Sequence, residues 1–247
     1  MNRSMSVLDR VTLAMVLAAF CPAGCSGPTA AVHPAAPAST SAPANISAPR
    51  QDALASLRQG NERFVRGTSA GRRQSLLAGQ KPLAVVVCCS DSRVGPELVF
   101  GQGLGDIVVV RVAGNVVDPV VQGSVEYAVE HLHAPLIVVM GHDDCGAVKA
   151  AVADDHATGA IAAVVGRIRG SVEAAESQGL KDDAAVNAVT DLNIKASIQE
   201  ISASPIVSKA LAKGAVKILG ARYHLASGRV EWLETKPSPT TATAPAK

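Results

Sequence analysis

Four short segments rich in Val, Ile and Leu lie along the middle of the chain, and each has the length of one strand. They are residues 83–88, 107–112, 136–140 and 215–219. An apolar run of this length, bounded by Gly, Pro or polar residues, is typical of a strand that is buried on both faces of a sheet. A further pattern, with short apolar runs on either side of Ser227-Gly228, predicts a hairpin ending at residues 230–233.

Helical periodicity occupies the segments between these strands. The helices are expected over residues 52–66, 122–133, 145–152, 160–177 and 182–202. Strands that alternate with helices predict an α/β fold with a mostly parallel central sheet covered by helices. We expect four parallel strands plus an antiparallel C-terminal edge strand. Chemically active groups in such folds collect at the carboxyl ends of the strands.

Composition and charge narrow the picture further. The chain has 247 residues, enough for one sizeable domain or two small ones. Apolar residues make up 48% of it and aromatic residues only 2%, so the core must be built from Val, Ala, Leu and Ile. The formal net charge is +2, and no block of Lys and Arg with interleaved aromatics is present. These features argue against a nucleic-acid-binding protein.

The N-terminus reads as an export signal over residues 1–25. Two arginines precede an apolar stretch of about ten residues, 11–20, which is too short to span a bilayer as a helix. The Ala-Gly-Cys that ends at Cys25 resembles the cleavage site of bacterial lipoproteins, although Pro22 stands where Leu is usual. The expected location is therefore the periplasm, with a possible lipid anchor on Cys25. The alternative is a plain secretory signal cleaved near Ala30.

Two further segments carry few charges and many Ala, Pro, Ser and Thr residues. Residues 26–49 form a predicted disordered linker, and residues 236–247 form a predicted disordered tail. Such segments cannot bury enough apolar surface to offset the entropy of ordering. The folded domain is therefore expected over residues 50–235.

Two groups of reactive side chains follow predicted strands. Cys89, Asp91 and Arg93 come directly after the first strand, and His142 and Cys145 come directly after the third. Two thiolates and one imidazole form a donor set that binds Zn²⁺ well, and the two thiolates balance its charge. The helix that follows should stabilise the Cys145 thiolate through its N-terminus. The sequence therefore predicts a zinc site at this edge of the sheet.

The neighbouring Asp91 and Arg93 indicate a reactive site rather than a structural one. Arg93 can hold the Asp91 carboxylate through two hydrogen bonds and keep it off the metal. Asp91 could then accept a hydrogen bond from a zinc-bound water; released, it could become a fourth ligand and close the site. Two alternatives remain open: a structural zinc site, and a Cys89–Cys145 disulfide in a protein without metal.

Three motifs closely resemble the β-class carbonic anhydrases. They are Cys-Ser-Asp-Ser-Arg-Val at 89–94, Arg-Val-Ala-Gly-Asn at 111–115 and Gly-His-x-x-Cys-Gly at 141–146. The resemblance covers about residues 51–233. It implies zinc-dependent, reversible hydration of carbon dioxide to bicarbonate and a proton. In that reaction zinc-bound hydroxide attacks CO₂. The resemblance assigns Cys89, His142 and Cys145 as the zinc ligands. It assigns Asp91-Arg93 as the catalytic dyad that orients the hydroxide.

The same resemblance implies substrate contacts and an assembly. Gln80 matches a glutamine that hydrogen-bonds substrate, and Gly146 matches a position whose backbone N–H does likewise. Val86 stands where some members carry a Trp of an inhibitory bicarbonate site, which favours the constitutively open type. The family site lies at a subunit interface, which implies a homodimer or homotetramer with the N-terminal helix packed on its neighbour. Alternative functions are CS₂ or COS hydrolysis on the same fold, or a non-catalytic zinc-binding regulatory domain.

The remaining polar residues receive structural interpretations. Cys88 should be a small buried apolar residue. Arg111, inside an apolar strand, needs a partner: the resemblance implies a role in a subunit interface, and the alternative is a buried ion pair within the subunit. Asp143 and Asp144 are interpreted as charges at a helix N-terminus. Surface or helix-end positions are expected for the histidines 131, 133, 156 and 224.

Overall fold

The computed structural model describes residues 53–233, apart from 68, 154–156 and 181. The predicted signal 1–25, linker 26–49 and tail 236–247 therefore lie outside the described residues, together with Cys25 and His156. The expected domain boundaries at residues 50 and 235 lie just beyond the described range. Among the helices in this part of the chain, none combines the length and apolarity that crossing a membrane requires.

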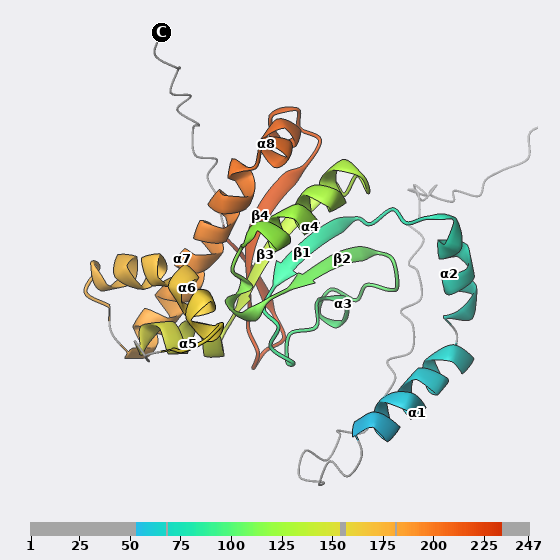
Figure 1. Ribbon diagram of the computed structural model, residues 1–247, viewed down its shortest axis with the longest axis horizontal. Coiled ribbons are helices and arrows are strands. Elements are labelled where there is room, and N and C mark those ends of the chain that lie inside the picture. Colours follow the sequence, from blue (N-terminus) through green and yellow to red (C-terminus); the bar gives the residue numbers. More distant parts are fainter. Residues whose placement is uncertain (1–52, 68, 154–156, 181, 234–247) are drawn as a thin grey trace, which may run out of the picture. The chain divides into compact units, whose positions relative to one another are not determined.

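The centre of the fold is a five-stranded sheet in the order β2-β1-β3-β4-β5 (Figure 1). Its strands are β1 (Ala84–Cys88), β2 (Ile107–Arg111), β3 (Leu136–His142), β4 (Lys217–Tyr223) and β5 (Val230–Leu233). The first four pair in parallel, and β5 pairs antiparallel with β4. The predicted sheet of four parallel strands with an antiparallel C-terminal edge strand is thus confirmed. Both β3 and β4 extend beyond the predicted runs, because their last residues still pair with each other.

The described residues also form eight α-helices and two short 3₁₀ turns, of which α1, α2 and one 3₁₀ turn precede β1. The helices are α1 (Ala53–Arg66), α2 (Ala70–Ser75), α3 (Pro96–Val99), α4 (Pro119–Glu130), α5 (Gly146–Val152), α6 (Ile161–Glu176), α7 (Asp182–Ala203) and α8 (Pro205–Ala212). The 3₁₀ turns are η1 (Leu76–Ala78) and η2 (Ala113–Asn115). Helices α2, α3 and α8 are absent from the sequence prediction. The predicted start of α4 is three residues late, because Asp118 caps that helix and Pro119 occupies its first turn.

The two faces of β1 and β3 pack into different clusters, as the alternation of side chains along a strand requires. Val85 and Val139 belong to a cluster with apolar residues of α4, α7 and α8, which lie beside the sheet in Figure 1. Val86 and Met140 point the other way, into a cluster with residues of α3 and β4. A third cluster lies among α5, α6 and α7, and it contains Cys89 and Cys145. The reactive thiols are therefore built into the packed core.

The burial expected for the second apolar run is only partly found. Every residue of β1 is buried, whereas the apolar residues of β2 are half-buried. The reason is position: β2 lies at the edge of the sheet and has one neighbour, β1, among the described strands. Periodicity along a chain does not reveal the order of strands in a sheet, so this exposure was not predictable from the run itself.

Helix α1 matches its predicted bounds closely but buries none of its residues. Its apolar side chains are exposed, including Leu57, 72% exposed, and Leu54, 56% exposed. An amphipathic helix is stable in water when its apolar stripe is covered by another surface. The described part of this chain does not supply that surface.

Candidate metal centre

The carboxyl ends of β1 and β3 bring the three predicted ligands together. Cys89 directly follows the last residue of β1, His142 is the last residue of β3, and Cys145 is the N-cap of α5. Because β1 and β3 are adjacent and parallel, their carboxyl ends meet at one edge of the sheet. The ligand atoms of the three side chains all lie within 4.8 Å of one another. The strand-end placement expected from the sequence is what the structure shows.

The geometry and burial of these side chains fit a tetrahedral zinc ion. The sulfur atoms of Cys89 and Cys145 are 3.9 Å apart, and two sulfur ligands about 2.3 Å from one tetrahedral zinc would lie about 3.8 Å apart. All three side chains are buried. Cys88, Cys89 and Cys145 are free thiols, so the alternative of a Cys89–Cys145 disulfide is not what the structure contains.

The imidazole of His142 is oriented for metal binding. Its Nδ1 lies 2.7 Å from the carbonyl oxygen of Asp143, and since a carbonyl only accepts, Nδ1 must carry the proton. The other nitrogen, Nε2, is buried and has no hydrogen-bond partner among the described residues. A buried nitrogen lone pair without a partner is costly unless a ligand satisfies it. The donor set and this unpaired atom therefore both fit zinc.

The thiols perturb each other strongly because they lie so close. The Cys145 thiol donates a hydrogen bond to the Cys89 sulfur, which holds the pKa of Cys89 far below its usual value. The same contact and burial raise the pKa of Cys145, and this outweighs the lowering by backbone N–H groups at the start of α5 that the sequence suggested. Burial alone would lower the pKa of His142, but the Cys89 thiolate raises it above its ordinary value. The negative charge of the cluster is therefore concentrated on the Cys89 sulfur.

The turn η2 supports the Cys89 thiolate with a backbone donor. The N–H of Gly114 lies 3.4 Å from the Cys89 sulfur. The carbonyl oxygen of Gly114 accepts a hydrogen bond of 2.7 Å from the buried side-chain amide of Asn193. Ser197, one helical turn further along α7, donates to the carbonyl of Asn115 at 3.0 Å. Asn193 and Ser197 were not predicted from the sequence. The signal available was two polar residues four apart on the side of α7 that also carries Val189, Ile194 and Ile201.

Gly114 can only be glycine in this arrangement. Its φ is +66°, and a Cβ atom would lie 2.8 Å from Ile168 Cδ1 and 3.1 Å from Ala147 Cβ. We expect Gly114→Ala to lower the free energy of unfolding by about 1–3 kcal/mol through backbone strain alone, and to weaken zinc binding as well. Urea unfolding of the zinc-loaded protein and competition with a chromophoric chelator measure these effects. Gly166→Ala, in α6 with open space around it, is the matched control and should change neither quantity for the worse. Equal stability and zinc affinity for both variants would contradict this role of Gly114.

Asp91 and Arg93 form the expected bidentate pair beside the cluster. Arg93 Nε donates to Asp91 Oδ1 at 3.0 Å, and Arg93 Nη2 donates to Asp91 Oδ2 at 2.7 Å. The Arg93 guanidinium lowers the pKa of Asp91 to about 2. Asp91 Oδ2 also lies 4.0 Å from His142 Nε2. The carboxylate is therefore ionised, held by Arg93 and close to the position that a metal would occupy.

Arg111 supports the turn that carries this pair. The alternative of a buried ion pair is not what the described residues show, and the expected role in a subunit interface stays a prediction. Its guanidinium donates to two backbone carbonyls, that of Cys89 at 3.2 Å and that of Asp91 at 2.6 Å. Arg111 is the last residue of β2, level with the end of β1, so its side chain reaches the turn directly. Backbone carbonyls, rather than a carboxylate, satisfy its charge within the described residues.

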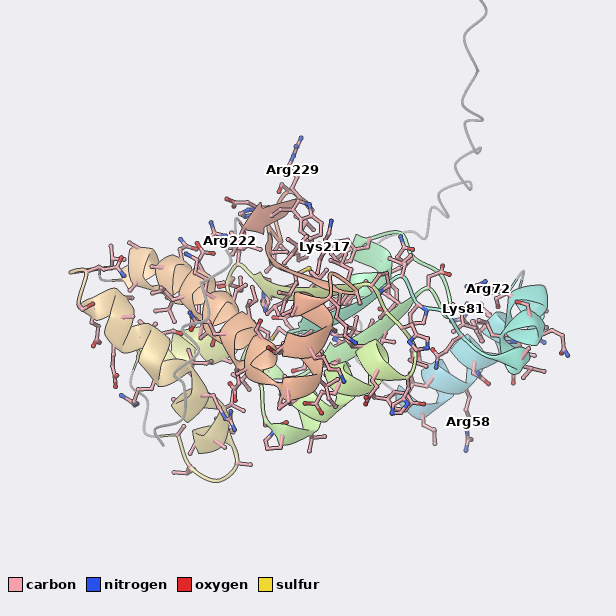
Figure 2. The ribbon with its side chains drawn as sticks, turned by 90° about the horizontal axis from the view of Figure 1, so that it is seen from above. Arg58, Arg72, Lys81, Lys217, Arg222 and Arg229 are labelled. Carbon is pink, nitrogen blue, oxygen red and sulfur yellow. The ribbon has the colours of Figure 1, made fainter. Side chains whose placement is uncertain are left out.

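Asp143 was interpreted as a charge at a helix N-terminus, but it lies before α5, and the first turn of α5 contains no acidic residue. Asp143 belongs instead to a network of charged side chains. His224 Nδ1 lies 2.9 Å from Asp143 Oδ2, and His224 Nε2 lies 3.1 Å from Glu231 Oε2. The Asp143 carboxylate raises the pKa of His224. Arg222, labelled in Figure 2 near the β4–β5 hairpin, lies 3.4 Å from Asp191 and 3.9 Å from Asp143. His224, expected at the surface or at a helix end, is 29% exposed and lies beside the hairpin turn, where it takes part in this network.

Asp144 also lies outside α5 and faces the dyad. Its carboxylate accepts a hydrogen bond of 3.1 Å from Arg93 Nη1, and its backbone carbonyl lies 3.3 Å from Arg93 Nη2. Lys149 pairs with the other oxygen of the Asp144 carboxylate. The interpretation of Asp144 as a plain helix N-terminal charge is therefore replaced by a specific contact with Arg93.

The remaining predicted residues occupy distinct places. Gly146 is the first residue of α5, and no described atom lies within 4 Å of the position that a Cβ would take there, which leaves room for a small molecule. Gln80 precedes β1 and lines a cavity of about 730 Å³ along β2, whereas Cys89 follows the other end of β1, about 16 Å away along a five-residue strand. One chain therefore does not bring its own Gln80 to the cluster.

The expectations for Cys88 and for two histidines hold. Cys88 is fully buried, and burial raises its pKa to about 12, so it is an inert apolar residue. Val86 is buried in the core on the side of Met140, and its link to bicarbonate inhibition stays a prediction. His131 is the C-cap of α4, and the exposed His133 lies just beyond it.

Comparison with known proteins agrees with this site. The carbonic anhydrase family matches residues 84–230. Carbonic anhydrase 2 of Mycobacterium tuberculosis is 44% identical over 188 residues, which cover 72% of this chain and 89% of that protein. A Coccomyxa β-carbonic anhydrase, solved in complex with acetazolamide, is 30% identical with a TM-score of 0.65, over 73% of this chain and 86% of that one.

A third similar protein is one of the tetrameric β-carbonic anhydrases of the ascomycete Sordaria macrospora. It is 26% identical with a TM-score of 0.66, over 74% of this chain and 95% of that chain. The shared fold has the same mostly parallel sheet flanked by helices, and the Cys89–His142–Cys145 cluster could hold a metal ion. On its sequence, its fold and this cluster, the chain belongs to the β-class carbonic anhydrases, which are zinc enzymes that hydrate carbon dioxide reversibly.

Proposed function

We propose that Asp91 and Arg93 are the catalytic dyad of carbon dioxide hydration at a zinc ion held by Cys89, His142 and Cys145. The observation that carries this assignment is the bidentate Arg93–Asp91 pair, with Asp91 Oδ2 only 4.0 Å from the metal-facing nitrogen of His142. A purely structural zinc site does not require a carboxylate such as that of Asp91, which lies 4.0 Å from His142 Nε2 and is held by Arg93.

The chain's own residues divide the work. Zinc, when bound, acts as a Lewis acid and lowers the pKa of a water molecule so that hydroxide is available near neutral pH. Asp91 Oδ2 accepts a hydrogen bond from the attacking oxygen and orients it, and Arg93 keeps that carboxylate charged and away from the metal. Gly146 is the first residue of α5, with open space where a side chain would be, and its backbone N–H is the proposed donor to an oxygen of the substrate. Val86, in place of a Trp, removes one part of a bicarbonate inhibitory site.

The pH dependence of the rate tests this division. The pKa of Asp91 is depressed to about 2, so the ion pair is complete above its ordinary pKa of 3.8 and is lost only as the pH falls through about 2. Asp91 therefore does not titrate between pH 6 and 9. With three histidine ligands, the pKa of a zinc-bound water is about 7. Two thiolates donate more charge to zinc than imidazoles do, so we expect a higher water pKa here and an activity that rises between pH 6 and 9. A pH–rate profile of kcat/KM for CO₂ hydration that stays flat from acid to neutral pH would contradict the assignment.

We also propose that the active form is a homodimer or a homotetramer. Three observations support it: the exposed apolar side chains of α1, the half-buried edge strand β2, and the separation of Gln80 from its own metal cluster. A second copy could cover α1 and supply its Gln80 to this site. The similar Sordaria proteins are described as tetrameric. Sedimentation equilibrium tests the proposal, and a fully active monomer would overturn it.

The final part of the proposal concerns location. We infer that the protein is exported and anchored in the membrane through a lipid on Cys25, on the strength of the arginines, the apolar stretch 11–20 and the Ala-Gly-Cys motif. Metabolic labelling with a fatty acid analogue should mark the wild type and leave Cys25→Ser unlabelled. Export without labelling would favour a plain secretory signal, and retention in the cytoplasm would contradict export altogether.

A further inference from the structure

Arg93 is held from two sides by acidic residues of two different loops. On one side lies Asp91, two residues away in the turn after β1. On the other side lies Asp144, 51 residues further along the chain, which contacts the guanidinium through its carboxylate at 3.1 Å and its carbonyl oxygen at 3.3 Å. The catalytic assignment uses only the first of these contacts, so the second needs its own explanation.

The backbone at Asp144 is shaped to make this contact. Its φ is +58°, a left-handed backbone conformation that residues other than Gly, Asn and Asp rarely adopt. Asp144 lies between His142 and Cys145 in the chain, so its contact with Arg93 joins the two loops that carry the metal ligands. Lys149, one turn into α5, pairs with Asp144 Oδ1, the carboxylate oxygen that does not contact Arg93, and so helps to fix the orientation of the Asp144 carboxylate.

The degree of exposure explains why a second contact matters. The side chain of Arg93 is 49% exposed, whereas that of Asp91 is 18% exposed. The Asp144 side chain is also 49% exposed, so neither ion pair gains much energy by itself, and the two partners act by limiting where the guanidinium can go. Two partners in fixed positions on opposite sides restrict the guanidinium to one plane, because rotation away from Asp91 would also break the bonds to Asp144.

We propose that Asp144 is a positioning residue, which fixes Arg93 against Asp91 and thereby keeps the Asp91 carboxylate out of the zinc coordination sphere. The inference rests on the proposed roles of Asp91 and Arg93. Without Asp144, Arg93 moves away from Asp91 more often, and the carboxylate of Asp91 is free to take the fourth position on the metal. Asp144 thus biases the site toward its reactive form without touching the substrate.

A second reading of Asp144 is a charge that merely stabilises the start of α5. The two readings predict different results for two substitutions. Asp144→Gly removes the carboxylate, accepts the left-handed backbone without strain and retains the carbonyl that Arg93 contacts. Asp144→Asn tolerates the same backbone and keeps one oxygen acceptor, but removes the charge. Neither variant introduces strain, so a loss of activity reports on the carboxylate.

The experiment compares these variants by stopped-flow CO₂ hydration and by zinc content. For Asp144→Gly we expect kcat/KM to fall about tenfold with one zinc per chain still bound, and for Asp144→Asn a smaller fall. Asp118→Asn, at the N-cap of α4, is the matched control and should keep full activity, since Asn caps a helix as well as Asp does. Wild-type activity in Asp144→Gly would overturn the proposal, as would a fall that merely follows loss of zinc.

Two further readouts separate positioning from general stabilisation. In the cobalt-substituted protein, Asp144→Gly should change the visible spectrum as Asp91 becomes a ligand, and the change should vanish when Asp91→Asn is added. In an Arg93→Leu background, Asp144→Gly should cause no additional loss of activity, because its target is already gone. An unchanged cobalt spectrum, or a full tenfold loss in the Arg93→Leu background, would contradict the inference.

The outcomes also separate this inference from the proposed function. If the wild type hydrates CO₂ and Asp91→Asn does not, the dyad stands, and the behaviour of Asp144→Gly alone decides the role of Asp144. If the wild type carries zinc and does not hydrate CO₂, the proposed function fails first, and the cobalt spectra still report whether Asp144 controls the position of Asp91.

Discussion

Replacing Asp91 with asparagine is expected to lower kcat/KM for CO₂ hydration about a hundredfold or more while zinc stays bound. Asparagine has the shape of aspartate, so the turn after β1 should persist. It lacks the negative charge that Arg93 holds through two hydrogen bonds, and it is a weaker acceptor for the attacking oxygen. Stopped-flow hydration at pH 8, with zinc measured in the same samples, gives both quantities.

The control for this change is again Asp118→Asn, which alters the same functional group at a helix cap. It should retain both zinc and activity, because the amide oxygen can still accept from the N–H groups of Val120 and Val121. Full activity in Asp91→Asn would show that the dyad plays no part in the chemistry. Loss of zinc from Asp91→Asn would show instead that Asp91 is a metal ligand in the resting protein.

A second large effect is expected from two adjacent cysteines that differ in role. Cys89→Ala should abolish stoichiometric zinc binding and reduce hydration to the uncatalysed rate, because one of three protein ligands is gone. Cys88→Ala should keep zinc and activity and cost only about 1 kcal/mol of stability. The side chains of the two residues point into different clusters of the core, and only that of Cys89 faces His142 and Cys145.

Zinc content by mass spectrometry under native conditions and stopped-flow hydration measure the contrast between the two variants. Each variant serves as the control for the other, since the substitution is the same and the positions are neighbours. Zinc retained at full occupancy in Cys89→Ala, or lost in Cys88→Ala, would contradict the assignment of the metal site.

Much of this site could be predicted because its chemistry is concentrated in short stretches of sequence. Cys89 and His142 lie at the ends of continuous apolar runs, and such runs become adjacent parallel strands whose carboxyl ends meet. Residue type then limits the possibilities, since two thiolates and an imidazole select zinc over harder cations. Local spacing was also enough to predict the pairing of Asp91 with Arg93, two residues apart.

The parts that could not be predicted depend on contacts between distant residues. Asp144 reaches Arg93 only because its backbone turns into the left-handed region, and no short-range pattern marks that turn. Arg111 finds two carbonyls because β2 lies beside β1, and the order of strands is a property of the whole sheet. Asn193 binds the carbonyl of Gly114 from 79 residues away. These contacts arise from tertiary packing, so they required the fold.

Some misses were avoidable, since the local signals were present in the sequence. Ser204 followed by Pro205 is a standard helix start, and the Ser204 hydroxyl does accept from the N–H groups of Ile206 and Val207 at the start of α8. Asp118 and Pro119 mark the start of α4 in the same way. Capping residues therefore mark the starts of α4 and α8 more precisely than apolar periodicity does.

The most direct test of the account is stopped-flow CO₂ hydration by the purified protein as zinc is removed with a chelator and then restored. We expect fast hydration at one zinc per chain, loss of activity in proportion to the zinc removed, and recovery when zinc returns. Stoichiometric zinc without hydration would contradict the account, and it would direct attention to CS₂ or COS hydrolysis or to a non-catalytic zinc-binding role.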